Sequence, residues 1–580
     1  MSDRETLVGA YQAGQLPEAI QAAISPDRSE RAKLASVLAS LHNEGRIDLF
    51  NVFGALTNKS APSRDFFLLR HVFEELLPEL EAPVAKLIRC VLHLYREAGI
   101  DLAAGTVLEA FRDFCARQAD RPKAALAEIE ADPETLADLL VPVLIAGSTV
   151  DPRTYVAETI RLSHGESIDL RRRALFALGR IGGEQAVWNN PDVAKTLEHV
   201  IEVEEDDQVL ASSIKSAFAL SRHDATNQSR WIAVVAGALT KGGEIALHAA
   251  SEIFGFQTND LSPEFLELLL ANLAQVKPSN KGTLDNIDYG IAHLLRSKHA
   301  EEGLCFLESL LRSHPQEIGF SNFNDVMRAI RDHPGLLSKV ATRWFLGGEA
   351  VLCEGVTFIV DAPPSASPEI EVDVGELMAG VDPVRFVFAA RKAIGYLFLK
   401  PICATSFLLS LMRQAPDSGV RSELESLLLN PLLINFSGSV AEYLARRAES
   451  EEGEVKVAVR RALDALEAYL DDLKSVGNIP ALHSSLEHRD AYRRHFSEEV
   501  AQSFKRAQAE SVFLQLIHRS VLLYGRKAIH HVFGPEGQIK RSEMQLGSHG
   551  TEIEFPRMTR VDPHGLEFML RVFRHERMST

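Results

Sequence analysis

Two short stretches near the end of the 580-residue chain each place an arginine a few positions before a histidine. Arg489 precedes His495 by six positions, and Arg526 precedes His531 by five. An arginine can stabilise negative charge, and a histidine can transfer a proton near neutral pH. These residue types could therefore carry out acid–base chemistry on an anionic substrate.

Both spacings resemble the ribonuclease motif of HEPN helical domains. The resemblance implies that the arginine stabilises phosphate charge, that the histidine transfers a proton, and that both project from one helix end. The chain holds 20 histidines, so about four or five such spacings are expected by chance. Residues 488–490 read His-Arg-Asp, the triplet with which the catalytic loop of protein kinases begins. The glycine-rich loop and the Asp-Phe-Gly motif that a kinase also needs are absent from the sequence. The four residues therefore stay candidates for a nucleic-acid-cleaving or toxin-like effector of a defence system, and none is assigned to catalysis.

Ligand-type side chains also gather in this region. They are His530, His531, His549, His564, Glu543, Glu552 and Glu554. Nitrogen and oxygen ligands of this kind bind zinc, but no His-Glu-x-x-His or comparable spacing holds them on one rigid element. We interpret these histidines as surface or core residues, and we expect neither a metal site nor a cofactor.

Basic residues alternate with aromatic ones along the same region. The candidate binding residues are Arg493, Arg494, Lys505, Arg506, Lys527, Lys540 and Arg541, interleaved with Tyr492, Phe496, Phe504, Tyr524 and Phe533. Such a pattern can bind single-stranded nucleic acid, but it is also typical of a solvated helix face, and Glu498 and Glu499 dilute the charge. The whole chain has 62 basic and 80 acidic residues, a net charge of -18, which opposes binding to a polyanion.

Helical periodicity dominates the elements that must position these residues. Over 455–473 the apolar residues recur every three or four positions, which places them on one side of a helix. Segments with the alternation of a strand are almost absent. With 46% hydrophobic and 24% charged residues, the composition is that of a globular protein, and the sequence predicts an all-α fold.

One heptapeptide recurs and indicates the class of helical fold. Residues 174–180 read ALFALGR, residues 216–222 read SAFALSR, and 250–255 carry a fainter echo. These residues resemble a HEAT repeat, whose period is about 40 to 47 residues. The resemblance implies a HEAT-like α-solenoid of paired antiparallel helices in which Phe176 is buried. Small residues such as Ala177 and Gly179 would let neighbouring helices approach closely.

The expected domain order follows from these patterns. It comprises an N-terminal helical region (1–150), the HEAT-like repeats (151–350), a loop or short hairpin linker (351–381), a second helical, HEAT-like region (382–480) and a histidine-rich C-terminal region (481–580). Three prolines and a β-branched patch at 356–360 predict the linker, which is the favoured internal boundary.

The C-terminal region is expected to be mixed but mostly helical. Its 15 basic and 12 acidic residues make it weakly basic. We expect one or two helices over 497–533, a short strand at 551–555 and a final helix after Asp562 and Pro563. The face of that final helix that would dock or cap the array carries Leu566, Met569, Leu570 and Phe573.

Together these patterns favour a protein-binding scaffold or adaptor over an enzyme. No catalytic constellation exceeds chance, whereas a solenoid offers an extended surface to another protein, with Leu570 and Phe573 as further binding candidates. The five cysteines lie far apart without a Cys-x-x-Cys pair, and no uninterrupted apolar stretch is long enough to span a membrane. We expect a cytoplasmic protein without a membrane partner; the alternatives are the effector and a HEAT-like nucleic-acid binder.

Overall fold

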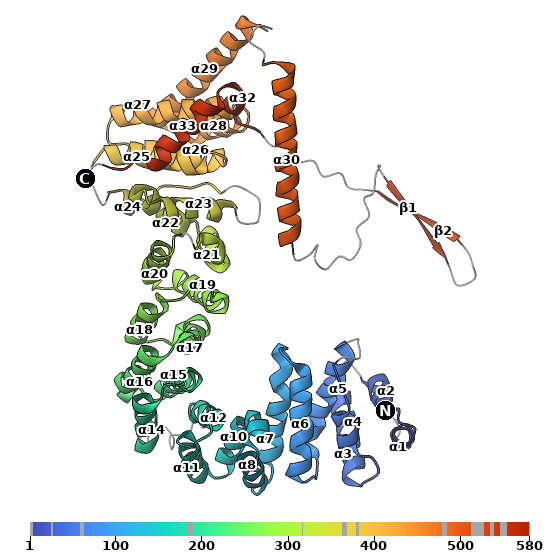
Figure 1. Ribbon diagram of the computed structural model, residues 1–580. Coiled ribbons are helices and arrows are strands. Elements are labelled where there is room, and N and C mark those ends of the chain that lie inside the picture. Colours follow the sequence, from blue (N-terminus) through green and yellow to red (C-terminus); the bar gives the residue numbers. More distant parts are fainter. Residues whose placement is uncertain are drawn as a thin grey trace. The chain divides into compact units, whose positions relative to one another are not determined.

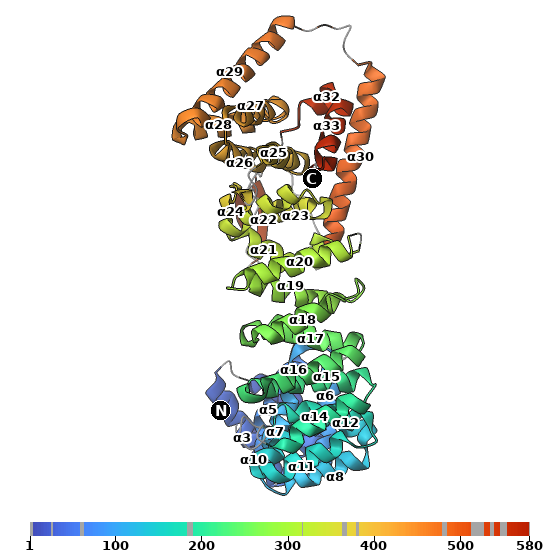
Figure 2. The ribbon, with the colours of Figure 1, turned by 90° about the vertical axis from the view of Figure 1, so that its left-hand side faces the viewer.

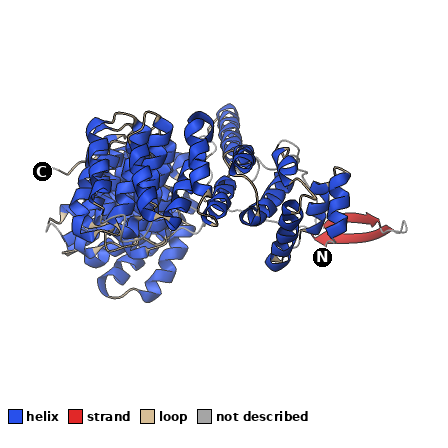
Figure 3. Cartoon of the chain, turned by 90° about the horizontal axis from the view of Figure 1, so that it is seen from below, coloured by secondary structure: helices blue, strands red, loops and turns tan. Residues whose placement is uncertain are grey.

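The structure is a computed structural model of the chain. It describes residues 4–24, 27–58, 63–181, 190–315, 317–361, 368–378, 382–477, 479, 484–511, 527–533, 539–545 and 554–578. These residues are predominantly helical, and their only paired strands form one hairpin (Figure 3). The all-α prediction is therefore confirmed, with the hairpin as its exception in the C-terminal region.

The chain divides into two compact units, Met1–Asp332 and His333–Thr580, which are called unit 1 and unit 2 below. The division falls between two helices, α21 (Asn324–Arg331) and α22 (Pro334–Gly347), and not within 351–381. Each unit has its own buried apolar core, for example around Phe111 in unit 1 and Phe407 in unit 2, both fully buried.

Unit 1 contains only helices among its described residues (Figure 1). Its α-helices are α1 (Arg4–Gln12), α2 (Leu16–Ala23), α3 (Arg28–Asn43), α4 (Leu49–Gly54), α5 (Ser63–Leu76), α6 (Val84–Ala98), α7 (Thr106–Ala116), α8 (Arg121–Ala131), α9 (Pro133–Leu136), α10 (Leu140–Val150), α11 (Pro152–Ser163), α12 (Ile168–Leu178), α14 (Pro191–Val203), α15 (Asp207–Ser221), α16 (Gln228–Lys241), α17 (Glu244–Phe256), α18 (Pro263–Leu273), α19 (Lys281–Leu295), α20 (Ala300–Ser313) and α21 (Asn324–Arg331). Short 3₁₀ turns connect some of them.

Unit 2 combines helices with the hairpin. Its elements are α22 (Pro334–Gly347), α23 (Ala350–Asp361), α24 (Val374–Met378), α25 (Val384–Leu397), α26 (Pro401–Gln414), α27 (Ser418–Leu427), a π-helical turn (Leu428–Leu433), α28 (Ser439–Ser450), α29 (Gly453–Val476), α30 (Leu486–Glu510), β1 (Lys527–Phe533), β2 (Ile539–Gln545), α32 (Met558–Val561) and α33 (Pro563–His575).

Aspartate followed by proline begins several helices, as the sequence pattern predicts. Asp151 precedes Pro152 and accepts the N–H of Thr154 at 3.2 Å at the start of α11. Asp562 does the same for α33, where it accepts the N–H of Gly565 at 2.9 Å. The aspartate satisfies a donor that has no partner within the helix, and proline in the first turn lacks only an N–H that the helix does not use.

One row of helices runs through the middle of unit 1. Along it α12 contacts α15, α15 contacts α17, α17 contacts α19, and α19 contacts α21. The helices between them in the chain, α14, α16, α18 and α20, lie on the other side of this row (Figure 1), where α14 contacts α16 and α16 contacts α18. Unit 1 is therefore two layers deep along this stretch.

Small residues let the helices of the row approach closely. A Cβ at Gly179 would lie 2.7 Å from the Cα of Ser216, and the Gly179 N–H donates to the Ser216 hydroxyl at 3.2 Å. Gly290 similarly faces the Phe254 ring, 2.4 Å from where its Cβ would stand. These contacts join α12 to α15 and α17 to α19, so the small residues of the recurring heptapeptide have the role that the sequence indicated.

Phe176 differs from the prediction that it is buried. Its ring is half-buried, and the Arg180 guanidinium carbon lies 4.1 Å from the ring centre. The aligned Phe218 is only 5% exposed, and Phe254 is fully buried. The sequence match placed Phe176 on the correct helix, but the shared heptapeptide does not specify how deeply that side chain enters the core.

Carboxylates also tie the row together by capping a neighbouring helix. Asp207 in α15 accepts the N–H groups of Gly243, Ile245 and Ala246 at 2.7 to 3.0 Å, where α17 begins. Asp288 in α19 accepts the N–H groups of Asp325 and Val326, both at 2.9 Å, at the start of α21. An anion is favoured at a helix N-terminus because the free N–H groups and the helix dipole both attract it.

One segment of unit 1 is apolar enough to cross a membrane by length and composition alone. This segment, Pro133–Val150, has a mean hydropathy of 1.3, and 56% of it is buried inside the structure. Its C-terminal part, α10, contacts α7, α8, α11 and α12. Packing within unit 1 accounts for this apolar stretch, since a core helix has the same composition.

The linker predicted over 351–381 is wrong for its first third, because residues 350–361 form α23. Leu352, Val356, Ile359 and Val360 of this helix are at most 3% exposed. Burial on one helical face outweighs the strand preference of the branched side chains, which is weak and depends on context. Residues 362–367 and 379–381 lie outside the described part, and 368–373 have no regular secondary structure.

One prediction for the C-terminal region is also wrong, and another falls mostly outside the described residues. The helix expected over 497–533 is described as far as Glu510, and Lys527–Phe533 form β1, which pairs antiparallel with β2. Ile529, Val532 and Phe533 favour a strand, and glycines and a proline follow them in the sequence. Glu554 and Phe555 have no strand structure, and the rest of the strand expected at 551–555 lies outside the described residues.

Candidate functional site

The first predicted pair, Arg489 and His495, does not form a site. Both residues lie on α30 and are exposed. Successive residues of an α-helix turn by about 100°, so positions six apart point about 120° away from each other. His495 lies 3.4 Å from Glu499 instead, in an ion pair on the helix surface. The shared helix end that the HEPN resemblance implies is absent at this pair.

The histidine of the second pair lies on a strand. His531 belongs to β1, where its backbone pairs with Arg541 of β2. Arg526 lies outside the described residues. His531 is therefore not at the helix end that the HEPN resemblance implies.

The predicted metal ligands are not gathered in the described structure. His530 and His531 are neighbours in β1. Among the described residues no group of three or more His, Cys, Asp or Glu side chains could hold a metal ion. His549 and Glu552 lie outside that part, Glu543 is exposed on β2, and His564 is exposed in the first turn of α33.

Glu554 has a different role, because it caps α28. Its carboxylate accepts the N–H groups of Gly438 and Ser439 at 2.7 and 2.8 Å and the Ser439 hydroxyl at 2.5 Å. Burial acts to raise the pKa of Glu554, but these donated hydrogen bonds outweigh it and hold the pKa below its ordinary value. The carboxylate therefore connects the C-terminal segment to the rest of unit 2.

The predicted basic residues are distributed over α30 and the hairpin. Arg493, Arg494, Lys505 and Arg506 are exposed on α30, and Lys527, Lys540 and Arg541 lie on β1 and β2. The basic residues of α30 are balanced by an equal number of acidic residues on the same helix, namely Glu487, Asp490, Glu498, Glu499 and Glu510. Arg493 lies 3.9 Å from Asp490, and the Arg494 Nε donates to the Asp490 carbonyl at 3.3 Å. This balance weakens α30 as a path for a phosphate backbone.

Leu570 lies in a segment that docks onto unit 2 itself, residues 554–578, called the C-terminal strap below. Leu566 and Leu570 are 6% and 5% exposed where α33 packs on α25, whereas Met569 and Phe573 are half-buried. The Arg391 guanidinium carbon lies 6.0 Å from the Phe573 ring centre. Leu570 is thus covered within the chain and is not exposed to a partner.

Polar contacts fix both ends of the strap. At its end, the fully buried Lys392 donates through Nζ to the Arg574 carbonyl at 2.6 Å, and the Arg574 Nε donates to the Gly395 carbonyl at 2.6 Å. Burial lowers the pKa of Lys392. Near its start, the Asn435 side chain accepts the N–H of Met558 at 2.9 Å. A cation at the carbonyl end of α33 is also favoured by the helix dipole.

The strap and α30 enclose a groove that sequence reasoning missed. Figures 1 and 2 both show α30 beside α32, and the Phe496 and Phe555 rings meet edge to face with centroids 5.5 Å apart. The groove has a volume of about 750 Å³, and its lining includes Tyr492, Phe496, Phe555, Arg557, Arg560 and Val561. Tyr492 is 51% exposed, Phe555 55% and Val561 71%. Exposed rings gathered in one groove are a common sign of a binding surface.

A second exposed aromatic group lies on the row of unit 1. Phe256 at the end of α17 is 62% exposed, and its ring lies 5.6 Å from that of Tyr289 on α19, which is 39% exposed. His293, one turn further along α19, lies 4.7 Å from Tyr289. The sequence placed Phe256 at the edge of the repeat-like region but carried no signal that these three rings meet.

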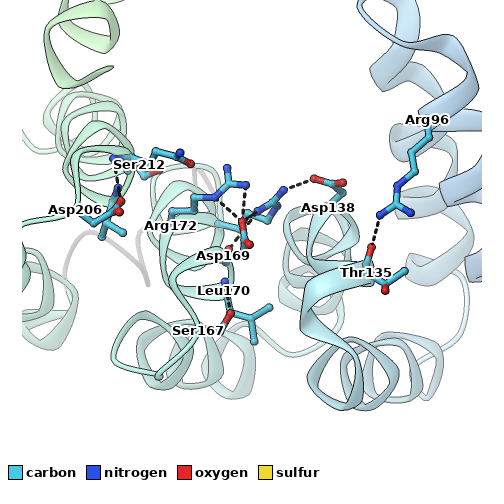
Figure 4. A network of polar contacts seen from close by, with 12 residues as sticks. Arg96, Thr135, Asp138, Ser167, Asp169, Leu170, Arg172, Asp206 and Ser212 are labelled. Atoms are coloured by element: carbon cyan, nitrogen blue, oxygen red, sulfur yellow. Dashed lines mark hydrogen bonds and ion pairs between the residues drawn. The ribbon is translucent and has the colours of Figure 1, made fainter. Parts of the chain in front are cut away.

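The three successive arginines of α12 are structural. Figure 4 shows the Asp169 carboxylate beside Arg172, with Asp138 across from them on the preceding helices. Arg173 reaches Asp138 and also Asp169, the latter at 2.8 Å, while Arg171 pairs with Glu204 after α14 at 3.1 Å. These arginines connect α12 to elements before and after it, so they are already partnered and do not form a free basic patch.

The comparisons with known proteins add no relative: no protein-family model matches the sequence, and no curated protein is similar to it.

Proposed function

We propose that the protein is a protein-binding scaffold or adaptor, built as a HEAT-like α-solenoid and acting in the cytoplasm. The observation that supports this most directly is the row in unit 1, where α12, α15, α17, α19 and α21 each contact the next. Stacking of neighbouring helix pairs is how a solenoid buries its apolar faces. The caps that Asp207 and Asp288 give to the following helices of the row fit the same repeated arrangement.

A surface on this row suits a protein partner. The rings of Phe256, Tyr289 and His293 form a contiguous group on α17 and α19, in which Phe256 and Tyr289 are exposed and His293 is half-buried. Aromatic side chains supply much of the binding energy at protein interfaces because they bury a large area with few rotatable bonds. We therefore place a partner contact at this group.

Little supports the effector alternative. Arg489 and His495 diverge on an exposed helix, and a proton donor must lie within hydrogen-bond reach of the reacting group beside the charge-stabilising residue. The cytoplasmic proposal draws on the five cysteines, which form no disulfide with one another. Burial raises the pKa of Cys90, Cys115 and Cys353 to about 12, which keeps these thiols in their unreactive form.

The test is capture of partners by the full-length protein from an extract of its native cells, with and without nuclease treatment. We expect at least one protein to co-purify in the presence of nuclease and to be lost when Phe256→Ser and Tyr289→Ser are combined. Val203→Ser is the matched control, because Val203 is a 63% exposed apolar residue on α14, in the other layer.

Loss of all captured protein on nuclease treatment would contradict the scaffold and support nucleic-acid binding. A nuclease activity of the purified chain that disappears in a folded His495→Ala variant would instead establish the effector.

A further inference from the structure

The groove between α30 and the C-terminal strap carries positive charge that the protein does not neutralise. Arg557 has a buried Nη1 without a hydrogen-bond acceptor among the described residues, and its guanidinium carbon lies 5.9 Å from the Tyr469 ring. Arg560 is exposed, and no carboxylate in the described structure pairs with it. Other arginines, such as Arg385 and Arg421, also bury a guanidinium nitrogen without an acceptor. What points to a ligand is therefore the position of Arg557 in the groove lining beside Arg560.

Two other arginines of the strap, Arg571 and Arg574, have partners. Arg571 pairs with Glu567 at 2.9 Å, and Arg574 donates to the Gly395 carbonyl. The carboxylate that lines the groove, Glu554, is already held by the N-terminus of α28. The groove therefore offers two available guanidinium groups beside three exposed aromatic rings.

We propose that this groove binds an acidic linear peptide segment of a partner protein. Carboxylates of the segment would pair with Arg557 and Arg560, and an aromatic or proline side chain would pack between Tyr492 and Phe555. Arginine suits this role because its planar guanidinium binds a carboxylate through two parallel hydrogen bonds. The inference rests on the proposed scaffold function and names the chemistry of one of its partners.

Charge favours a peptide over nucleic acid at this groove. The chain carries a net charge of -18, and α30 carries no net charge, so the repulsion on a phosphate backbone grows with each nucleotide. A short peptide with a few carboxylates meets only the two arginines and is repelled far less. Recognition of acidic motifs by clustered arginines, with rings contacting the adjacent apolar side chain, is a known mode of peptide binding.

Fluorescence anisotropy of labelled probes with the full-length protein tests the proposal. The main probe is a twelve-residue peptide in which aspartates and glutamates flank two phenylalanines and a proline. The second probe replaces every acidic residue by lysine, and the third is single-stranded oligothymidylate of twelve nucleotides. We expect only the acidic peptide to bind, with a dissociation constant of ~100 µM or tighter at physiological salt.

Two variants locate the binding. Arg560→Glu should weaken the acidic peptide at least tenfold, and Tyr492→Ala should weaken it severalfold. Arg571→Glu is the matched control, because it makes the same charge change on α33, whose Arg571 side chain is 70% exposed and lies outside the groove lining. It should leave the affinity within about twofold.

Three results would overturn the proposal. They are no binding of the acidic peptide below 1 mM, equal binding of the lysine peptide, or equal effects of Arg560→Glu and Arg571→Glu. Tighter binding of oligothymidylate would assign the groove to nucleic acid. If the peptide assay fails and Arg560→Glu does not change the partners captured from the native extract, the groove proposal is contradicted and the scaffold proposal stands. If the peptide binds but no partner is captured, only the scaffold proposal is contradicted.

Discussion

Replacing Leu570 by aspartate is expected to release the C-terminal strap while the rest of unit 2 stays folded. Leu570 is 5% exposed against α25, and full burial of a leucine contributes about 2 to 3 kcal/mol. An unpaired carboxylate in that place adds a further desolvation cost, so we expect docking to weaken by about 4 kcal/mol. Because 1.4 kcal/mol is a factor of ten, amide exchange of α33 through local opening should accelerate by roughly several hundredfold.

Hydrogen–deuterium exchange of the full-length protein, read by mass spectrometry on peptides within 556–577, measures this opening. Phe568→Asp is the control, because it places the same residue on the same helix at a position that is 70% exposed. Both variants share the loss of helix propensity, so only Leu570→Asp should expose the strap. Equal exchange in the two variants, or unfolding of α25 and α26 together with the strap, would refute the separate docking of this segment.

Three further predictions concern unit 1. Burial raises the pKa of Asp288 to about 6, above its unfolded value of about 3.9, so the folded state binds the proton more tightly. The free energy of unfolding, measured by denaturant titration, should therefore fall by about 2 to 3 kcal/mol as the pH rises from about 4 to 6. Asp288→Asn should remove this pH dependence. Gly179→Ala should cost about 1 to 3 kcal/mol in thermal unfolding because its Cβ would stand 2.7 Å from the Ser216 Cα, whereas Gly9→Ala, with nothing within 4 Å, should be neutral or stabilising. Phe218→Asp should destabilise by several kcal/mol and Phe176→Asp by clearly less, since the first ring is 5% exposed and the second is half-buried; equal losses would contradict the burial seen here.

Periodicity within a helix could be predicted from the sequence, because it depends only on neighbours three and four positions away. The helix over 455–473 is found within α29, and the small residues of the 174–180 heptapeptide lie where helices touch. The linker predicted at 351–381 was wrong because its structure depends on residues that are distant in the sequence. Whether Val356 and Val360 occupy a strand or a buried helix depends on what covers them, and that information lies in distant segments.

The candidate site predicted from the sequence was wrong, because residues close together along the chain were expected to lie close together in space. Arg489 and His495 are close in sequence and diverge on α30, whereas Phe496 and Phe555 are 59 positions apart and their rings meet. The groove exists only because the strap returns to α25 and α28 after the hairpin. No local pattern around Phe555 indicates that return, since its anchors are Glu554 on the α28 N-terminus and Lys392 on the last turn of α33.

The number of basic residues in a segment also does not show which of them can bind a ligand. Counted along the chain, α30 is the basic and aromatic segment, yet its cations are matched by carboxylates on the same helix. The strap has a similar formal balance, but Glu554, Glu567 and Glu576 are each engaged with a helix terminus or an arginine. Arg557 and Arg560 are left with no carboxylate among the described residues, so the charge available to a ligand lies in a segment whose composition did not mark it.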